Sequence, residues 1–245
     1  MCRDLLPENV RKLPQGELFQ FRCHPGVDCF TDCCRQLELA LTPYDVLRLK
    51  QALKLTSSEF LERHAVIEQE QGDVLPWVYL GMVDDGRASC PFVTSKGCVI
   101  YKDRPGACRI YPLGRAAFQN PEGKVGDFYV LITEPHCRGF KEKKKQDIRE
   151  WIQDQGLESY NEFNDLILPI IQHNKVKQGA RFTEDQIQKY MMSLYDLDAF
   201  AGLIKQPEFK GLDSFPDVNY KDISNSDTAL LRFGIRWIKR ELFGE

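Results

Sequence analysis

The sequence predicts an α+β fold in which a small cysteine-rich region, with short helices and a few antiparallel strands, is followed by a helical C-terminal region. Eight of the nine cysteines lie between residues 23 and 137. Residues 73–134 are rich in β-branched and aromatic side chains punctuated by Gly and Pro, a pattern typical of strands and turns. From about residue 141 onward the apolar residues recur at helical spacing. We therefore divide the chain into a cysteine-cluster domain, 1–140, and a helical region, 141–245, which we expect to pack on the first.

Length and composition favour a globular chain of one large or two small domains. The 245 residues are 42% hydrophobic, which supplies a core without disulfide cross-links. The net charge of -3 gives no electrostatic argument for wholesale nucleic-acid binding. The first residues, MCRDLLPENVRKLPQGE, contain no apolar run, and no stretch approaches the ~18 apolar residues of a membrane span. We expect a cytoplasmic protein without a membrane partner, in which thiols stay reduced.

The N-terminal half predicts short elements. Residues 1–22, with Pro7, Pro14 and Gly16, look irregular. Thr42 as N-cap, Pro43 at the first helical position and an acidic residue three positions after the cap predict a helix over 43–53. A second capping box at 56–59 predicts another helix directly afterwards. Residues 74–82 and 126–133 suit strands, whereas the segments around them, YPLG among them, are expected to be turns.

The C-terminal half predicts helices over 147–155 and 158–174, the second interrupted by Pro169. Thr183 is a cap signal before a helical stretch reaching residue 204. Residues 206–227 have turn chemistry and low periodicity. A final amphipathic helix over 228–243 is expected to pack on its own domain.

The cysteines form a pattern that indicates metal binding or redox chemistry in a reduced compartment. Thiolates are soft ligands that suit zinc and iron–sulfur clusters, and a tetrahedral site usually draws four of them from separate loops. Scattered buried cysteines would need no explanation, but these are clustered. Cys2 stands alone at the terminus and is expected to be incidental. The candidate metal ligands are the other eight: Cys23, Cys29, Cys33, Cys34, Cys90, Cys98, Cys108 and Cys137.

The adjacent pair Cys33 and Cys34 is an awkward pair of ligands for one metal ion, because the side chains of neighbouring residues tend to diverge. Each could serve a different centre, or one could be a ligand and the other packed or reactive. Eight thiols could supply two sites of four ligands, or one cluster with spare thiols. The sequence leaves these alternatives open.

Residues 90–114, CPFVTSKGCVIYKDRPGACRIYPLG, resemble the YkgJ-type cysteine-cluster family, described as zinc- or iron-chelating. Members carry a first cluster written CxxCxxCC; here its spacings are five and three, but the vicinal pair is present. Many members also have a late cysteine in a Cys-Pro-Gly-like context, which supports Cys137 as a ligand. The resemblance covers roughly residues 20–140. Flagellin lysine methylases resemble this family in their cysteine cluster, which implies possible protein-modifying chemistry.

Several residues near the cysteines have two interpretations. Arg104 and Arg109 could balance thiolate charge or pair with nearby aspartates. Tyr101, Tyr111 and Phe92 are expected to pack around the site. His24 and His136 could each replace a thiolate. The KEKKK run at 141–145 is expected to be a solvated helix start rather than a nucleic-acid patch.

The sequence therefore predicts a metal-binding protein that holds an iron–sulfur cluster, 4Fe–4S for example, or zinc. Irregular spacing with Pro beside ligands, and the lack of paired CxxC knuckles, favour iron–sulfur. One alternative is an enzyme, either an iron–sulfur redox protein or a protein-modifying one. Another is a metal-free thiol redox protein that uses Cys33 and Cys34. No nucleotide-binding or hydrolase motif is present, and no residue is assigned as catalytic. A protein partner or protein substrate is possible, whereas nucleic acid is not expected.

Overall fold

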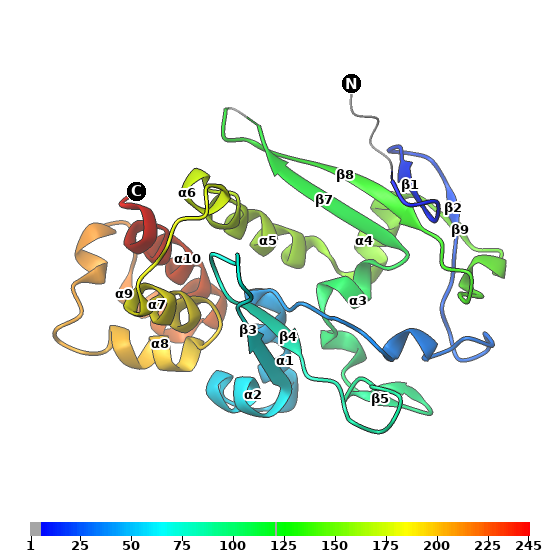
Figure 1. Cartoon of the computed structure of the whole chain (residues 1–245), viewed down its shortest axis with the longest axis horizontal. Coiled ribbons are helices and arrows are strands. Elements are labelled where there is room, and N and C mark those ends of the chain that lie inside the picture. Colours follow the sequence, from blue (N-terminus) through cyan, green and yellow to red (C-terminus); the bar gives the residue numbers. More distant parts are fainter. Residues whose placement is uncertain (1–5, 121) are drawn as a thin grey trace. The chain divides into compact units, whose positions relative to one another are not determined.

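The computed structural model describes residues 6–120 and 122–245, so Cys2 lies outside the described residues. Helices and short antiparallel strands are both present, with helices in the C-terminal part, and the α+β prediction is confirmed (Figure 1). The chain forms two compact units, one from residues 1–37 and 82–162, the other from 38–81 and 163–245. Both units use residues from both sides of residue 140, where the sequence places a domain boundary; that boundary stays a prediction.

The first unit contains every described cysteine and is built from short elements. Its strands are β1 (Val10–Leu13), β2 (Phe19–Gln20), β5 (Val93–Thr94), β6 (Gly97–Cys98), β7 (Leu113–Gln119), β8 (Val125–Ile132) and β9 (Lys145–Gln146). Its helices are α3 (Gly106–Ile110) and α4 (Ile148–Gln155), with 3-10 turns η1 (Asp32–Cys34), η2 (Tyr101–Asp103) and η3 (Gly139–Lys141). Strands β1, β8 and β7 lie side by side in one antiparallel sheet, with Val10 opposite Ile132 and Leu113 opposite Leu131 (Figure 1).

Aromatic side chains form the core of the first unit. Phe21 contacts the rings of Tyr111 and Trp151 edge-on, at centroid distances of 5.7 Å each. Trp151 also donates its indole N–H to the Ile110 carbonyl at 2.9 Å. The chain just before Cys23 and the chain just after α3 are therefore held on the same aromatic cluster.

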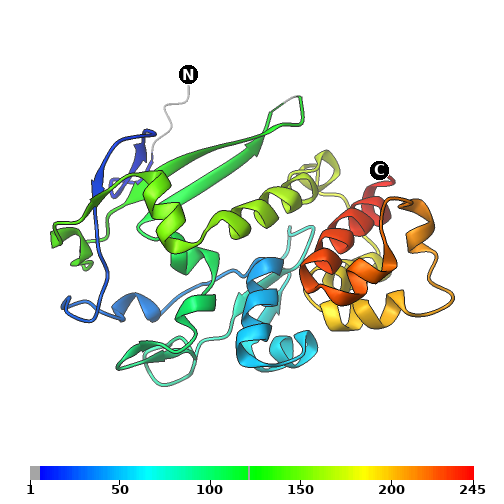
Figure 2. The ribbon, with the colours of Figure 1, turned by 180° about the vertical axis from the view of Figure 1, so that it is seen from behind.

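The second unit is mostly helical. It contains the hairpin of β3 (Ala65–Glu68) and β4 (Trp77–Leu80), and the helices α1 (Pro43–Leu53), α2 (Ser57–His64), α6 (Asn174–Lys177), α7 (Glu184–Leu194), α8 (Leu197–Ile204), α9 (Tyr220–Asn225) and α10 (Asp227–Phe243). The 3-10 turn η4 (Gly211–Ser214) precedes α9, and α5 (Glu158–Ile171) passes from the first unit into the second. Helix α10, red in Figure 2, packs against α7, α8 and α9 and carries much of the buried apolar surface.

The capping signals predicted at Thr42, Thr56 and Thr183 locate three helix starts correctly. Complete capping boxes at Thr42, Thr56, Asp147 and Thr183 begin α1, α2, α4 and α7. Each box satisfies backbone N–H groups that a helix start would otherwise leave unpaired. No helix within the described parts of the chain is long and apolar enough to cross a bilayer.

The structure differs from the sequence-based elements in five places. Pro169 lies inside α5, which continues to Ile171 because its neighbours Leu168 and Ile170 are buried. The stretch ending at residue 204 divides into α7 and α8, since Asp196 accepts from the Ala199 N–H and caps a new helix. Helix α9 forms within 206–227, and β7 begins inside the YPLG segment expected to be a turn. Residues 1–22, expected to be irregular, contain β1 and β2.

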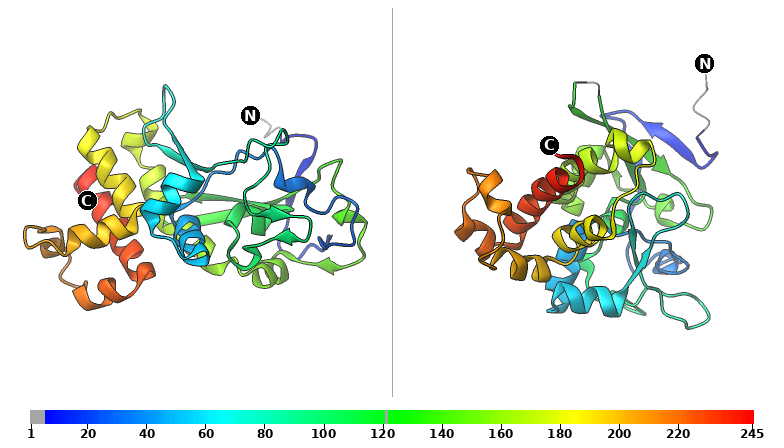
Figure 3. Two further views of the ribbon diagram at one scale, coloured as in Figure 1. Left: turned by 90° about the horizontal axis from the view of Figure 1, so that it is seen from below. Right: turned by 60° about the vertical axis from the view of Figure 1, so that its left-hand side comes forward.

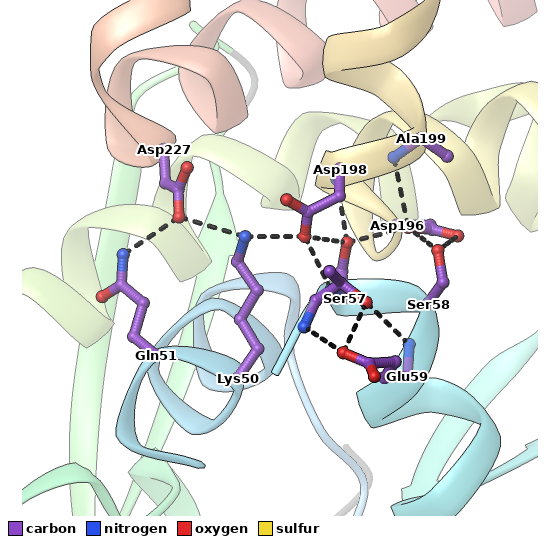
Figure 4. Close-up of polar contacts among 10 residues, drawn as sticks. Lys50, Gln51, Ser57, Ser58, Glu59, Asp196, Asp198, Ala199 and Asp227 are labelled. Carbon is purple, nitrogen blue, oxygen red and sulfur yellow. Dashed lines mark hydrogen bonds and ion pairs between the residues drawn. The ribbon is translucent and has the colours of Figure 1, made fainter. Parts of the chain in front are cut away.

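A buried lysine ties the start of the second unit to its C-terminal helices. Lys50, 5% exposed, contacts Asp198 at 2.9 Å and Asp227 at 3.1 Å (Figure 4). Ser57 donates both its N–H and its hydroxyl to Asp198, at 2.6 and 2.8 Å. Burial opposes the charge of Lys50, yet the hydrogen bond to Asp198 and the charge of Asp227 leave its pKa raised. Lys50 is therefore a protonated structural cation and cannot act as a base toward Ser57.

Lys50→Met is expected to lower the free energy of unfolding by about 2 kcal/mol, because it leaves Asp198 and Asp227 facing each other without their cation. The two carboxylates are partly exposed, so the loss is smaller than for a fully buried pair. Urea denaturation measures it. The matched control is Lys221→Met, on an exposed position of α9, which should change stability by less than about 0.5 kcal/mol.

The effect of Lys50→Met on the free energy of unfolding should depend on pH. Burial acts to raise the pKa of Asp198, but hydrogen bonds from Lys50 and Ser57 lower it overall. A lowered carboxyl pKa contributes stability above its unfolded value and loses it as pH falls through the folded value. The difference in the free energy of unfolding between wild type and Lys50→Met should therefore become smaller at acidic pH. A gap that is constant from neutral to acidic pH would contradict this account of the network.

Candidate metal centre

Cys23 and Cys137 are brought together by backbone hydrogen bonds between their neighbours. The Arg22 N–H donates to the Gly139 carbonyl at 3.1 Å, and the Phe21 N–H donates to the Lys144 carbonyl at 3.2 Å. The segment that leads into Cys23 therefore runs beside the segment that follows Cys137.

Cys29 joins the same neighbourhood through its sulfur. The Arg138 backbone N–H donates to Cys29 Sγ at 3.0 Å. Successive turns fold the loop between Cys23 and η1, with Val27 N–H bonded to the His24 carbonyl and Asp32 N–H to the Cys29 carbonyl. This hydrogen bond holds the turn that follows Cys137 against Cys29.

Cys34 is joined to the second cysteine segment. The Cys90 N–H donates to the Cys34 carbonyl at 2.8 Å, and the Gln36 N–H donates to the Ala88 carbonyl at 2.8 Å. Residues 34–36 thus pair antiparallel with 88–90. Adjacent to this pairing, the Val93 N–H donates to the Cys90 carbonyl, and Val93 lies opposite Cys98 in the hairpin of β5 and β6.

Arg109 holds the segment from Cys98 to Cys108 in place. Its guanidinium is buried and donates to the carbonyls of Lys102, Arg104 and Gln155. It also lies 4.7 Å from the Tyr160 ring centroid. Through these contacts Arg109 links η2, α3 and the end of α4.

Arg104 contributes positive charge to the thiols. Its guanidinium stacks on Tyr101, 3.8 Å from the ring centroid, and donates to the Tyr101 carbonyl at 2.6 Å. Burial raises the pKa of Cys98, and the charge of Arg104 acts against that rise. Of the two roles that the sequence allowed for these arginines, charge balance therefore fits Arg104 and structural bracing fits Arg109.

The thiols influence one another electrostatically across the three cysteine segments. Burial, followed by the charges of Cys33, Cys29 and Cys137, raises the pKa of Cys23 to about 11. A hydrogen bond with Cys33, then burial and the charges of Cys33, Cys90 and Cys108, raises the pKa of Cys34. Burial also raises the pKa of Cys90, with smaller contributions from Cys98 and Cys33. All eight predicted cysteines are thiols rather than disulfides.

The thiols are neighbours but do not form a preformed cage. Across residues 6–120 and 122–245, no three or more His, Cys, Asp or Glu side chains are grouped so that they could hold a metal ion. The fit to a metal therefore rests on the donor chemistry: soft thiols from separate loops, gathered in one compact unit.

Both histidines beside cysteines contact carboxylates. His24 Nδ1 accepts from the Gly26 N–H at 3.1 Å, and its Nε2 lies 3.2 Å from Glu142. His136 Nε2 lies 3.4 Å from Glu134. The Gly26 N–H accounts for His24 Nδ1, whereas His24 Nε2, although near Glu142, is buried without a hydrogen-bond partner among the described residues, so His24 stays a candidate ligand beside the thiols.

Tyr111 is a candidate functional residue that sequence reasoning assigned only to packing. Its hydroxyl is buried and has no hydrogen-bond partner among the described residues. Burial, followed by the nearby Cys137 and Glu134, raises its pKa. The phenol therefore stays protonated and is available to donate to a sulfur at Cys137. No local motif marks this role, because the pairing joins residues 26 positions apart in the sequence.

A set of thiols from separate loops in one unit is typical of a metal-chelating domain. Residues 22–138 match the family model CxxCxxCC, described as a putative zinc- or iron-chelating domain. The resemblance drawn from residues 90–114 is thereby confirmed, because the segment that contains them matches the model of that family. Chelation of a metal is the activity that the match supports. No curated protein and no solved structure matches the chain.

Proposed function

We propose that the protein binds an iron–sulfur cluster through its clustered cysteines, with zinc as the alternative metal. The observation that carries this proposal is the meeting of three cysteine segments, 23–34, 90–108 and 137, in one unit through direct backbone hydrogen bonds. The proposed ligands are the eight cysteines named above. Iron–sulfur is favoured over zinc because the spacings are irregular and paired CxxC knuckles are lacking.

The test is metal and sulfide analysis with an absorption spectrum on protein purified without oxygen. A broad absorbance near ~400 nm with iron and sulfide would support the cluster. A colourless protein with stoichiometric zinc would support a structural zinc site instead. Protein without metal, even after reconstitution with either metal, would contradict the proposal.

A metal-free thiol redox function is the second candidate, and one observation favours it. The hydrogen bond with Cys34 lowers the pKa of Cys33 to about 7, which increases its thiolate fraction at neutral pH. This function predicts that a double Cys33→Ser, Cys34→Ser variant loses thiol–disulfide exchange while its metal content stays that of wild type. Loss of metal in the double variant supports the chelation proposal.

Tyr111→Phe is expected to weaken metal binding about tenfold, because it removes the hydroxyl that we expect to donate to the Cys137 sulfur when metal is bound, while keeping the aromatic ring. Stability without metal should change by less than about 0.5 kcal/mol, since the deleted hydroxyl has no described partner to leave unpaired. Competition with a chromophoric chelator measures the affinity. Tyr101→Phe is the control, because the exposed Tyr101 contributes its ring face to Arg104. Equal metal affinities of the Tyr111→Phe and Tyr101→Phe variants would show that the Tyr111 hydroxyl does not contribute to metal binding.

A further inference from the structure

A cavity of about 510 Å³ is lined by residues of α7, α8, α10 and the segment 206–214 that includes η4. This volume lies within the range of ligand-binding pockets, about 300–1,000 Å³. Every residue that lines the cavity belongs to the second unit, which carries no cysteine. What the cavity binds is therefore a separate question from metal chelation.

Two aromatic side chains form the apolar wall of the cavity. The rings of Trp237 in α10 and Phe209, which follows α8, lie with their centroids 5.7 Å apart, and Leu203 adds aliphatic surface. Phe209 also packs edge-on against Phe233, at a centroid distance of 6.4 Å, which holds its segment against α10. An aromatic wall of this kind favours a planar apolar group in the ligand.

Trp237 also provides a hydrogen-bond donor that the protein does not use. The side chain is 4% exposed, yet its indole N–H has no hydrogen-bond partner among the described residues. Buried tryptophan N–H groups usually have a partner. Because this nitrogen is not fully enclosed by protein and Trp237 lines the cavity, the N–H can donate to an acceptor atom of a bound molecule.

The charges around the cavity leave one positive charge in excess. The charged lining residues are Lys189, Lys210, Arg240, Glu208 and Glu241. Lys189 is paired with Glu241 at 2.9 Å and with Asp185, outside the lining, at 3.0 Å. Lys210 and Arg240 have no ion pair within the described parts of the chain, and only Glu208 remains to oppose their two charges. A ligand with a single negative charge would neutralise the excess.

We propose that this cavity binds a small aromatic carboxylate. The ring of the ligand lies against Phe209 and Trp237, and its carboxylate pairs with Arg240 and accepts the Trp237 N–H. The planar guanidinium offers paired N–H groups that match the two oxygens of a carboxylate. A phosphate would carry about -1.5 to -2 charges near neutral pH, which exceeds the single positive charge in excess.

Calorimetric titration of the full chain with 2-naphthoate tests the proposal. Wild type should bind 2-naphthoate, and 2-naphthylmethanol, which keeps the rings but has no charge, should bind at least about tenfold more weakly. Arg240→Gln should weaken 2-naphthoate binding about tenfold or more, because it removes a charge-assisted hydrogen bond. The matched control is Lys205→Gln, on an exposed position that does not line the cavity, and it should leave the affinity unchanged.

Three results would overturn the proposal. They are a wild type that does not bind 2-naphthoate, equal affinities for 2-naphthoate and its neutral alcohol, and equal affinities of wild type and Arg240→Gln for 2-naphthoate. The comparison of the two ligands uses wild type alone, so it decides even if a variant fails to fold. Arg240 is exposed and its side chain has no described partner, so its replacement should leave the melting temperature unchanged.

Discussion

Removal of the metal is expected to lower the melting temperature of the protein by about 10 °C. Metal that binds only the folded chain stabilises it by about 4 kcal/mol when free metal exceeds the dissociation constant about a thousandfold. For a chain of this size each kcal/mol shifts the melting temperature by about 2–4 °C. The cysteine segments lie in turns, very short helices and the two-residue strand β6, which have little regular hydrogen bonding of their own.

Hydrogen exchange locates the effect and supplies an internal control. Amides in residues 86–110 and 133–141 should lose protection when the metal is removed, whereas α7 and α10 should keep theirs. Those helices belong to the second unit and carry no cysteine. An apoprotein with unchanged melting temperature and unchanged exchange would show that the metal contributes nothing to folding.

Gly234→Ala is expected to destabilise the protein by about 2–3 kcal/mol. Alanine normally improves an exposed helix interior by about 1 kcal/mol relative to glycine. At Gly234 in α10, however, an added Cβ would overlap the Ser193 carbonyl oxygen of α7 and lie 3.3 Å from the Phe200 ring. The overlap involves backbone, so relief requires α7 and α10, which lie against each other in Figure 3, to move apart.

Gly202→Ala is the matched control for this prediction. Gly202 lies in α8, and a Cβ added there meets nothing within 4 Å. It should raise the free energy of unfolding by up to about 1 kcal/mol. Urea denaturation measures the change in the free energy of unfolding, which should have opposite signs in the two variants. A Gly234→Ala variant that is as stable as wild type or more stable would contradict the close contact between α7 and α10.

Helix starts were predictable because a capping box is local. Thr42, Thr56 and Thr183 each bond to a residue only three positions away, so a short window of sequence contains the whole interaction. The start of strand β7 was not predicted, because the Gly-containing segment YPLG has no strand pattern of its own. The strand forms there because its partner β8 supplies the hydrogen bonds.

The candidate site was predictable in composition but not in arrangement. The residue type and the clustering identify the eight cysteines as candidate metal ligands, since a cluster of so many soft ligands has few roles other than metal binding. Their grouping depends on contacts such as Cys34 with Cys90 and Cys29 with Arg138, which join residues 56 and 109 positions apart. Tyr111 likewise acquires its role from Cys137, 26 positions away.

The interleaved order of the two units has a consequence for synthesis on the ribosome. Every segment of the first unit has been translated once residue 162 is added, whereas α1 and α2 must wait for α7–α10 before their own unit can close. Domains fold as their segments emerge, at about 5–20 residues per second. The nascent chain can thus present all of its thiols to a metal donor several seconds before the last helix appears.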